Sequence, residues 1–170
     1  MPAGSITSCL SKPYASFNIC NSMVKCVMAE DGLHHFLEAQ NAVYDQVISE
    51  LSQGQKRSHW MWFIFPQIIG LGFSHMAQRF AIQSLEHARR YATHPELGQR
   101  LRQCTRLVIQ VRGRAVSEIF GYPDDLKFHS SMTLFALAAA DEPFFDQALV
   151  KYFKGIRDAK TIEILGMEKK

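Results

Sequence analysis

Residues 56–67 run from polar side chains directly into a cluster of aromatic rings, and this stretch most constrains the fold. Two cations, a hydroxyl and an imidazole come first: Lys56, Arg57, Ser58 and His59. Four rings follow, both tryptophans of the chain among them: Trp60, Trp62, Phe63 and Phe65. Because burial of a large apolar side chain is worth roughly 1.5–3 kcal/mol, we expect these rings to anchor a core. The polar residues should then lie where that core meets water.

The length and composition of the chain are those of one globular domain. Its 170 residues are 47% hydrophobic, which suffices for one full core. No window approaches the roughly 18 consecutive apolar residues of a membrane-spanning helix, so we expect a soluble protein without a membrane partner. The formal charge of +3, from 19 Lys and Arg against 16 Asp and Glu, fits an anionic ligand better than a nucleic-acid coat.

The cysteines and histidines show no pattern typical of disulfides or metal sites. Cys9, Cys20 and Cys26 lie near the start of the chain, and Cys104 stands alone in a later apolar pattern. This favours a reducing, cytoplasmic compartment, with Cys104 as a small buried residue. The seven histidines lack an HExxH or similar spacing, so we predict no metal and no cofactor.

Residues 1–30 differ in composition from the rest of the chain. Residues 1–29 contain no acidic residue and no Arg, and they are rich in Ser, Asn and Cys. We predict a disordered leader over residues 1–30. An organelle-targeting peptide is the alternative, although such peptides usually carry Arg and an amphipathic face. The helical domain is expected to occupy residues 31–170.

From Asp31 onward, apolar residues recur at steps of three and four, the period of helices with one buried face. The first predicted helix runs from Leu33 to Leu51, with Asp31 as its cap and Gly54 as its left-handed end. The Trp-rich stretch before Pro66 should be a short helix or strand-like segment of at most about two turns.

Ser74 should cap a second long helix, whose inner face carries small residues and therefore predicts close packing. That face comprises Ala77, Ala81, Leu85, Ala88 and Ala92. Later helices are predicted from Pro95, from Pro123 toward Ala140, from Pro143 to Phe153 and between Asp158 and Gly166, with one capped turn at 117–121. Since no segment shows sustained period-two alternation, we predict an all-α fold of six or seven helices with short loops.

A series of motifs, in this order, is typical of one protein family. They are residues 56–67, 70–72, 76–82, 94–98, 118–121, 123–127 and 130–135. Together they resemble the bacterial family known as domain of unknown function 1810, over about Leu33 to Gly166. The resemblance implies a small, mainly helical, cytosolic domain, and it implies no reaction and no catalytic residue.

Polar residues gather where the predicted helices begin, end or meet loops. We predict that eight of them form a ligand site: Lys56, Arg57, Ser58, His59, Trp60, Gln67, Arg114 and Lys127. Arg suits bidentate recognition of phosphate or carboxylate, and Trp60 or Trp62 could stack a planar group. Such a pocket would favour a planar anionic metabolite such as a nucleotide.

The candidate catalytic residues, His59 and Asp124, each have a structural alternative. An imidazole can exchange protons near neutral pH, but one beside a Trp is also a common hydrogen-bonded structural residue. Asp124 and Asp125 suit the first turn of a helix, where carboxylates stabilise the helix dipole. Likewise, Arg57 and Arg114 could bond helix carbonyls or pair with these aspartates.

Three classes of function stay open. The favoured one is a site for a small phosphorylated or nucleotide-like ligand, with or without a reaction. The second is RNA or single-stranded nucleic-acid binding, with rings beside a row of arginines. That row would comprise Arg79, Arg89, Arg90, Arg100, Arg102 and Arg106. The third is a protein-interaction domain, which an apolar surface patch would favour.

Overall fold

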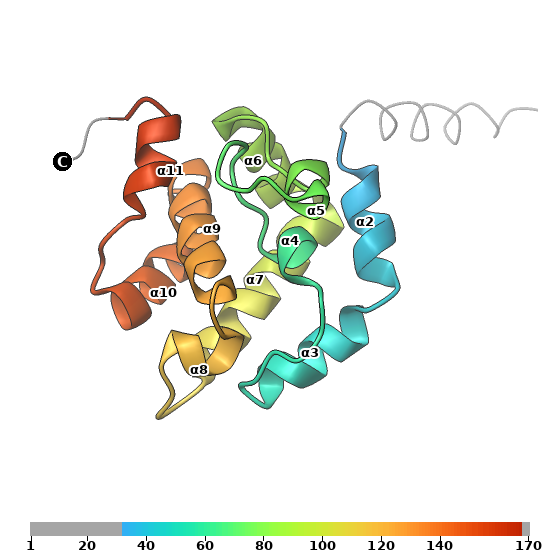
Figure 1. Cartoon of the computed structure of the whole chain (residues 1–170), viewed down its shortest axis with the longest axis vertical. Helices are drawn as coiled ribbons and strands as arrows, with labels where there is room; N and C mark the ends of the chain where they lie inside the picture. The colour runs from blue at the N-terminus through green and yellow to red at the C-terminus, as the bar shows by residue number, and fades with distance from the viewer. Residues whose placement is uncertain (1–31, 168–170) are drawn as a thin grey trace, which may run out of the picture. The chain divides into compact units, whose positions relative to one another are not determined.

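The structure is a computed structural model that describes residues 32–167, and these residues hold ten α-helices (Figure 1). The helices are α2 (His34–Asn41), α3 (Tyr44–Ser52), α4 (Met61–Ile64), α5 (His75–Arg79), α6 (Leu85–Thr93), α7 (Pro95–Gln110), α8 (Val116–Phe120), α9 (Asp124–Ala138), α10 (Pro143–Phe153) and α11 (Ala159–Ile164). The helical fold is confirmed, since the described residues contain no strand beyond one isolated bridge. No helix among them is long and apolar enough to cross a membrane. The predicted leader, its three cysteines and the Asp31 cap lie outside the described residues.

The predicted number of six or seven helices is wrong. Two predicted helices are each divided in two, and the short segments expected at the Trp-rich stretch and at 117–121 form the helices α4 and α8. The first division falls at Ala42 and Val43, between α2 and α3. There the N–H of Val43 donates to the carbonyl of Gln40 in a tight turn, and the backbone of Val43 leaves the helical region.

The second division separates α5 from α6, where a single helix from Ser74 to Ala92 was expected. Between them the chain leaves the helix, and Ile82 forms a parallel bridge with Ile68. The N–H of Ile82 donates to Gln67, and the carbonyl of Ile82 accepts from Ile69. These two segments thus satisfy each other's buried backbone groups, and Ser84 caps a new helix by accepting from His87.

Three of the four rings of the aromatic stretch are in the core, and the fourth, Trp62, is half-buried against it. Trp60, Phe63 and Phe65 are all buried, and α4 is the predicted short helix between Pro66 and the polar residues. Helix α7 packs against α2, α3, α4, α6 and α10, and Figure 1 shows α9 between α6 on one side and α10 and α11 on the other. Cys104 of α7 is fully buried, as predicted, and burial raises the pKa of its thiol to about 12.

Helices α6 and α7 meet at very close range, as the small-residue face predicted. Ala88 and Ala92 of α6 are buried. A Cβ atom placed on Gly98 of α7 would lie 2.0 Å from the carbonyl oxygen of Ala92, so only glycine fits there. His94 links the two helices, because its Nδ1 accepts from the first-turn N–H groups of α7.

Several predicted helix ends are confirmed by their hydrogen bonds or backbone angles. The Ser74 side chain accepts from Ala77 at the start of α5, and the Asp158 side chain accepts from Thr161 at the start of α11. Gly54 ends α3 with a φ of 65°, in the left-handed region that favours glycine.

Candidate functional site

Glu50, near the end of α3, organises the loop that carries most of the predicted site. Its Oε2 accepts hydrogen bonds from the backbone of Arg57 at 2.8 Å and of Ser58 at 3.1 Å, and from Nε1 of Trp60 at 2.8 Å. Its Oε1 accepts from Oγ of Ser58 at 2.6 Å and from Gln46. Burial favours a raised pKa for this carboxyl, but these hydrogen bonds outweigh it and hold the pKa at about 2. Glu50 is therefore an ionised anchor that fixes residues 57–60.

Sequence reasoning missed Glu50 as a functional residue, although a signal was present. Val47 and Leu51 mark the buried face of α3, and Glu50 lies three residues after Val47 on that same face. A carboxylate on a buried face needs donors, and the polar residues that follow α3 supply them.

Lys56, Asp124 and Lys127 form a partly buried cluster at the start of α9. Nζ of Lys56 lies 2.7 Å from Oδ2 of Asp124, and Nζ of Lys127 lies 2.6 Å from Oδ1. The three side chains are 9%, 16% and 20% exposed, in the order Lys56, Asp124, Lys127. Burial acts to raise the pKa of Asp124, but the two ammonium groups hold that pKa below its ordinary value. Asp124 is therefore an ionised partner of two lysines.

Two tryptophan rings flank this cluster, and they differ in access. Nζ of Lys127 lies 4.7 Å from the ring centroid of Trp62, and Nζ of Lys56 lies 5.3 Å from that of Trp60. Both are cation–π distances. Trp60 is only 1% exposed, whereas Trp62 is half-buried. Of the two rings predicted to stack a ligand, only Trp62 reaches the surface.

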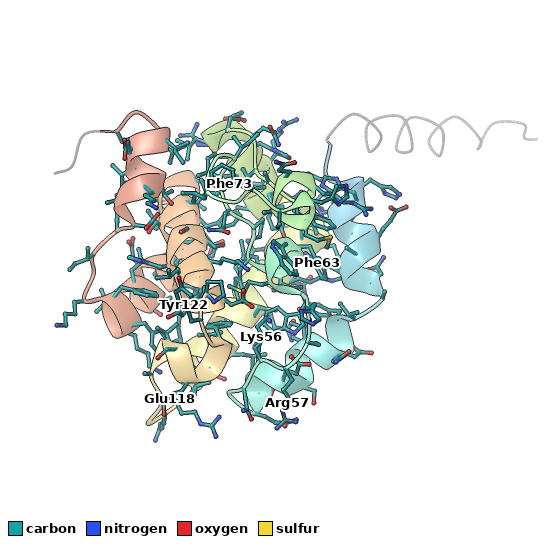
Figure 2. The ribbon with its side chains drawn as sticks, viewed as in Figure 1. Lys56, Arg57, Phe63, Phe73, Glu118 and Tyr122 are labelled. Atoms are coloured by element: carbon teal, nitrogen blue, oxygen red, sulfur yellow. The ribbon has the colours of Figure 1, made fainter. Side chains whose placement is uncertain are left out.

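The two predicted arginines lie at the end of α3. Nη2 of Arg57 donates to Oε1 of Gln55 at 3.3 Å, and Figure 2 shows Arg57 below Lys56, toward that helix end. Nη1 of Arg114 donates to the carbonyl of Gly54 at 2.9 Å. For Arg114 the structural alternative, a bond to helix carbonyls, is therefore observed. Among the described residues, Asp124 pairs with lysines rather than with these arginines.

The remaining predicted residues are dispersed. His59 is exposed, and Ser58 is engaged by Glu50. Gln67 is half-buried, and its backbone carbonyl belongs to the bridge region near Ile82. The structure therefore brings together Lys56, Lys127, the catalytic candidate Asp124 and the buried Trp60 ring. The side-chain contacts of Arg57, Ser58 and Arg114 described above lie elsewhere.

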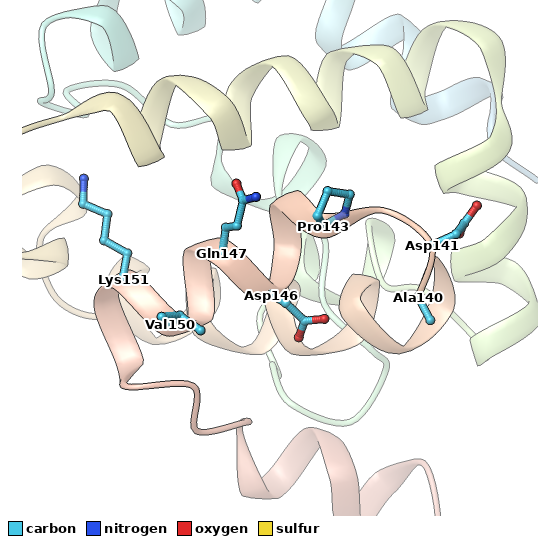
Figure 3. Close-up of a pocket in the computed structure, with 7 residues that line it drawn as sticks. All are labelled: Ala140, Asp141, Pro143, Asp146, Gln147, Val150 and Lys151. Carbon is cyan, nitrogen blue, oxygen red and sulfur yellow. The ribbon is translucent and has the colours of Figure 1, made fainter.

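A shallow hollow of about 510 Å³ lies along α10 and contains none of the predicted site residues. It is lined by Ala140, Asp141, Pro143, Asp146, Gln147, Val150 and Lys151. Figure 3 shows Gln147 and Lys151 on the side of α10 that faces the neighbouring yellow helix, with Asp146 and Val150 on the other side. Its walls come from one helix and the turn before it, so it does not enclose a ligand.

The arginines suggested as a nucleic-acid surface are largely paired within the domain. Arg89 contacts Glu86 at 3.3 Å, Arg102 contacts Glu142 at 3.3 Å, and Arg100 pairs with Glu96. Arg79 and Arg106 lie over phenylalanine rings instead. Because paired guanidinium groups attract phosphates less, this arrangement gives little support to nucleic-acid binding.

His87 is a buried histidine that the sequence did not single out. Its Nδ1 accepts from the backbone N–H of Gln83 at 3.1 Å, and its Nε2 is buried without a hydrogen-bond partner. Burial lowers the pKa of His87, with smaller contributions from Arg90 and His35. Within residues 32–167, no group of three or more His, Cys, Asp or Glu is arranged to hold a metal ion.

Apolar side chains are exposed on the loop before α5 and at the end of α11. We call them the Phe73 surface: Ile69, Phe73, Ile164 and Met167, which are 45%, 86%, 42% and 40% exposed. A Cβ atom on Gly70 would lie 3.4 Å from Cδ1 of Ile164, so the loop and α11 are in contact there. Figure 2 shows Phe73 on the loop, well away from Arg57.

Comparisons with known proteins bear on the fold and leave the reaction open. The model of a family described as "Protein of unknown function (DUF1810)" matches residues 30–165. The crystal structure of the conserved hypothetical protein Rv1873 from Mycobacterium tuberculosis is 51% identical in sequence, with a TM-score of 0.78, and the match covers 80% of this chain and 97% of that chain. No curated protein matches this chain.

Proposed function

The chain belongs to the DUF1810 family of proteins of unknown function, and from its own residues we propose that it binds a small phosphorylated or nucleotide-like ligand beside α9. We define the lysine site as Lys56, Lys127, Asp124 and Trp62. One observation carries the proposal: two ammonium groups, at 2.7 and 2.6 Å, converge on the two oxygens of a single carboxylate. An anion with several oxygens suits such a pair of donors.

The surroundings of the lysine site favour an anion over a neutral ligand. Lys56 and Lys127 are mostly covered, so solvent and salt screen their charges less than those of exposed lysines. Asp124 lies in the first turn of α9, a helix of 15 residues whose positive end also attracts negative charge.

The rings beside the lysine site favour a planar group attached to that anion. Trp62 is half-buried and Tyr122, two residues before Asp124, is 83% exposed. Stacking of a base on an aromatic side chain is worth about 1–3 kcal/mol. A nucleotide combines a phosphate with such a base, and it is the ligand class that we favour.

Our proposal is binding, and we assign no reaction. Asp124 is ionised and already holds two lysines, which makes it a poor proton donor. His59 is exposed on the loop and has no part in the lysine site as defined.

Thermal-shift titrations of the full chain with AMP and with inorganic phosphate test the proposal. A ligand that binds only the native state stabilises it by about 2.7 kcal/mol at about a hundred times its Kd. Lys127→Met removes one ammonium and keeps the aliphatic stem, so we expect at least about tenfold weaker binding. AMP should stabilise the wild type more than phosphate does, because only AMP can stack.

Two control variants define a negative result. Lys160→Met removes an exposed lysine of α11, and Arg57→Ala removes an exposed guanidinium outside the lysine site. Both should retain wild-type affinity within about twofold. If neither compound stabilises the wild type, or if Lys127→Met binds as Lys160→Met does, the proposed ligand site is wrong.

A second candidate is a protein-interaction domain, and the Phe73 surface is the observation that favours it. The Phe73 ring is 86% exposed, so it contributes little to the stability of the free monomer. Its burial against a partner would stabilise a complex. Chemical cross-linking in cells that make the full chain should give adducts that Phe73→Ser loses. Ile156→Ser, a change at another exposed residue, should retain them. Equal cross-linking of both variants would argue against this candidate.

A further inference from the structure

Resting on the proposed function, we infer that the Asp124 carboxylate occupies the place that the ligand's phosphate takes, so that binding exchanges one anion for the other. The carboxylate is thus an internal competitor of the ligand. Its removal should strengthen anion binding, whereas loss of an ordinary binding residue weakens it.

The geometry of the two contacts supports an exchange. Each oxygen of Asp124 has its own ammonium, Lys56 on Oδ2 and Lys127 on Oδ1. A phosphate monoester has three terminal oxygens, so it can accept from both ammonium groups in the same bridging manner. An ion with a single acceptor atom cannot give each ammonium group its own oxygen. The expected ligand group is therefore a phosphate or a carboxylate.

The charges around the lysine site favour one anion at a time. Asp124 neutralises only one of the two lysines, and a second anion placed beside it would be repelled at contact distance. Glu50 accepts from the Trp60 indole N–H and is already engaged by five donors. Asp124 is the group that an incoming phosphate must replace.

The Asp124 side chain can also leave its contact with the two lysines. Its side chain is 16% exposed, so rotation about its side-chain bonds can turn the carboxylate toward water. The backbone need not move, because the first turn of α9 is held by the bond from Asp125 N–H to the carbonyl of Gly121. The exchange therefore requires a change of rotamer only.

Asp125 provides a matched control for a test of this exchange. It is the neighbouring carboxylate, and its Oδ1 accepts from the N–H of Leu126 at 2.9 Å instead of from a lysine. Calorimetric titrations with inorganic phosphate and with AMP would compare the wild type, Asp124→Asn and Asp125→Asn as full chains. We expect Asp124→Asn to bind at least about tenfold more tightly than the wild type, since no ionic bonds need be broken first. Asp125→Asn should stay within about twofold of the wild type.

A measurement on the wild type covers the case in which Asp124→Asn folds poorly. Exchange moves the Asp124 carboxylate, so saturating phosphate should shift its side-chain carboxyl ¹³C resonance and leave that of Asp125 in place. If the wild type binds AMP while Asp124→Asn shows no gain and the resonance does not shift, the exchange is wrong and the ligand site stands. If neither the wild type nor Asp124→Asn binds either compound, the ligand site itself is wrong.

Discussion

Nε1 of Trp60 donates a hydrogen bond of 2.8 Å to Oε2 of Glu50, and this bond joins the aromatic core to the loop that carries Lys56. The indole is buried and Glu50 is 6% exposed, so the indole N–H depends on this carboxylate to satisfy its hydrogen bond. Arg57, Ser58 and Trp60 all donate to this one carboxylate, so the position of residues 57–60 should depend on Glu50.

Glu50→Gln should destabilise the domain by about 1–3 kcal/mol, because the charge is lost and one of two oxygens that both accept hydrogen bonds becomes an NH2 group that cannot accept them. Chemical denaturation at neutral pH would measure the loss. Glu163→Gln, the same change at an exposed position of α11, should alter the free energy of unfolding by less than about 0.5 kcal/mol. Equal effects of the two variants would contradict the anchoring role of Glu50.

The same carboxylate should make stability depend on acid pH. Its pKa is lowered from 4.5 to about 2 by folding, so the unfolded chain takes up the proton first as pH falls. The stabilisation from Glu50 is complete above 4.5 and is lost as pH falls from there toward 2. Denaturation curves across this range should therefore show that the free energy of unfolding falls more steeply with pH for the wild type than for Glu50→Gln.

Gly98→Ala should destabilise the domain by about 1–3 kcal/mol, since its Cβ would lie 2.0 Å from a backbone oxygen of α6. The clash should outweigh the better helix propensity of alanine, which is worth about 1 kcal/mol. Gln99→Ala, at the exposed neighbouring position, isolates the effect of the close contact. A melting temperature for Gly98→Ala equal to that of Gln99→Ala would show that α6 and α7 can separate without cost.

His87 should make the domain less stable at mildly acidic pH. Folding lowers its pKa below 6.5, so as pH falls through 6.5 the unfolded state binds the proton first and stability is lost. His87→Asn offers an oxygen in place of Nδ1 for the Gln83 N–H and removes the titration. Melting temperatures between about pH 7 and pH 5 should fall less for this variant than for the wild type. If the melting temperatures of the wild type and His87→Asn fall by the same amount, His87 does not cause the loss of stability at acidic pH.

Phe73→Ala should leave the free energy of unfolding unchanged within about 0.5 kcal/mol, because the ring is 86% exposed. Phe80→Ala, seven residues later, should cost about 3–5 kcal/mol, because that ring is buried against Phe36 and Phe63. Thermal denaturation of both variants checks the contrast. A large loss for Phe73→Ala would mean that its ring supports the fold.

Local signals in the sequence were enough to predict much of the fold. Ser74 and Asp158 cap their helices because their side-chain oxygens accept from N–H groups three residues on, and Gly54 ends α3 because it adopts a positive φ. Residues 80–84 could not be placed in this way. Ala81, Leu85 and Ala88 keep the helical period, while the bridge between Ile68 and Ile82 depends on a partner segment that periodicity does not reveal.

The predicted site shows the same limit. Lys56 and Lys127 were both expected to bind a ligand, but that they converge on Asp124 depends on how α9 packs against the loop after α3. Arg57 and Arg114 were grouped with them because guanidinium groups suit bidentate recognition of an anion and both lie where predicted helices meet loops, yet each bonds the segment that follows α3. Residue type predicted that these cations could bind an anion. Tertiary contacts determined which of them lie together in one site.

Cys104 lies in the middle of α7 with no exposed surface, and burial raises the pKa of its thiol to about 12. An alkylating reagent attacks the thiolate, so it should react with this cysteine only when α7 comes away from its neighbours. In a chain with Ser in place of Cys9, Cys20 and Cys26, the rate at which Cys104 is alkylated would measure how often the domain opens. A metabolite that lowers this alkylation rate would be identified as a ligand of the closed form without any assay of activity.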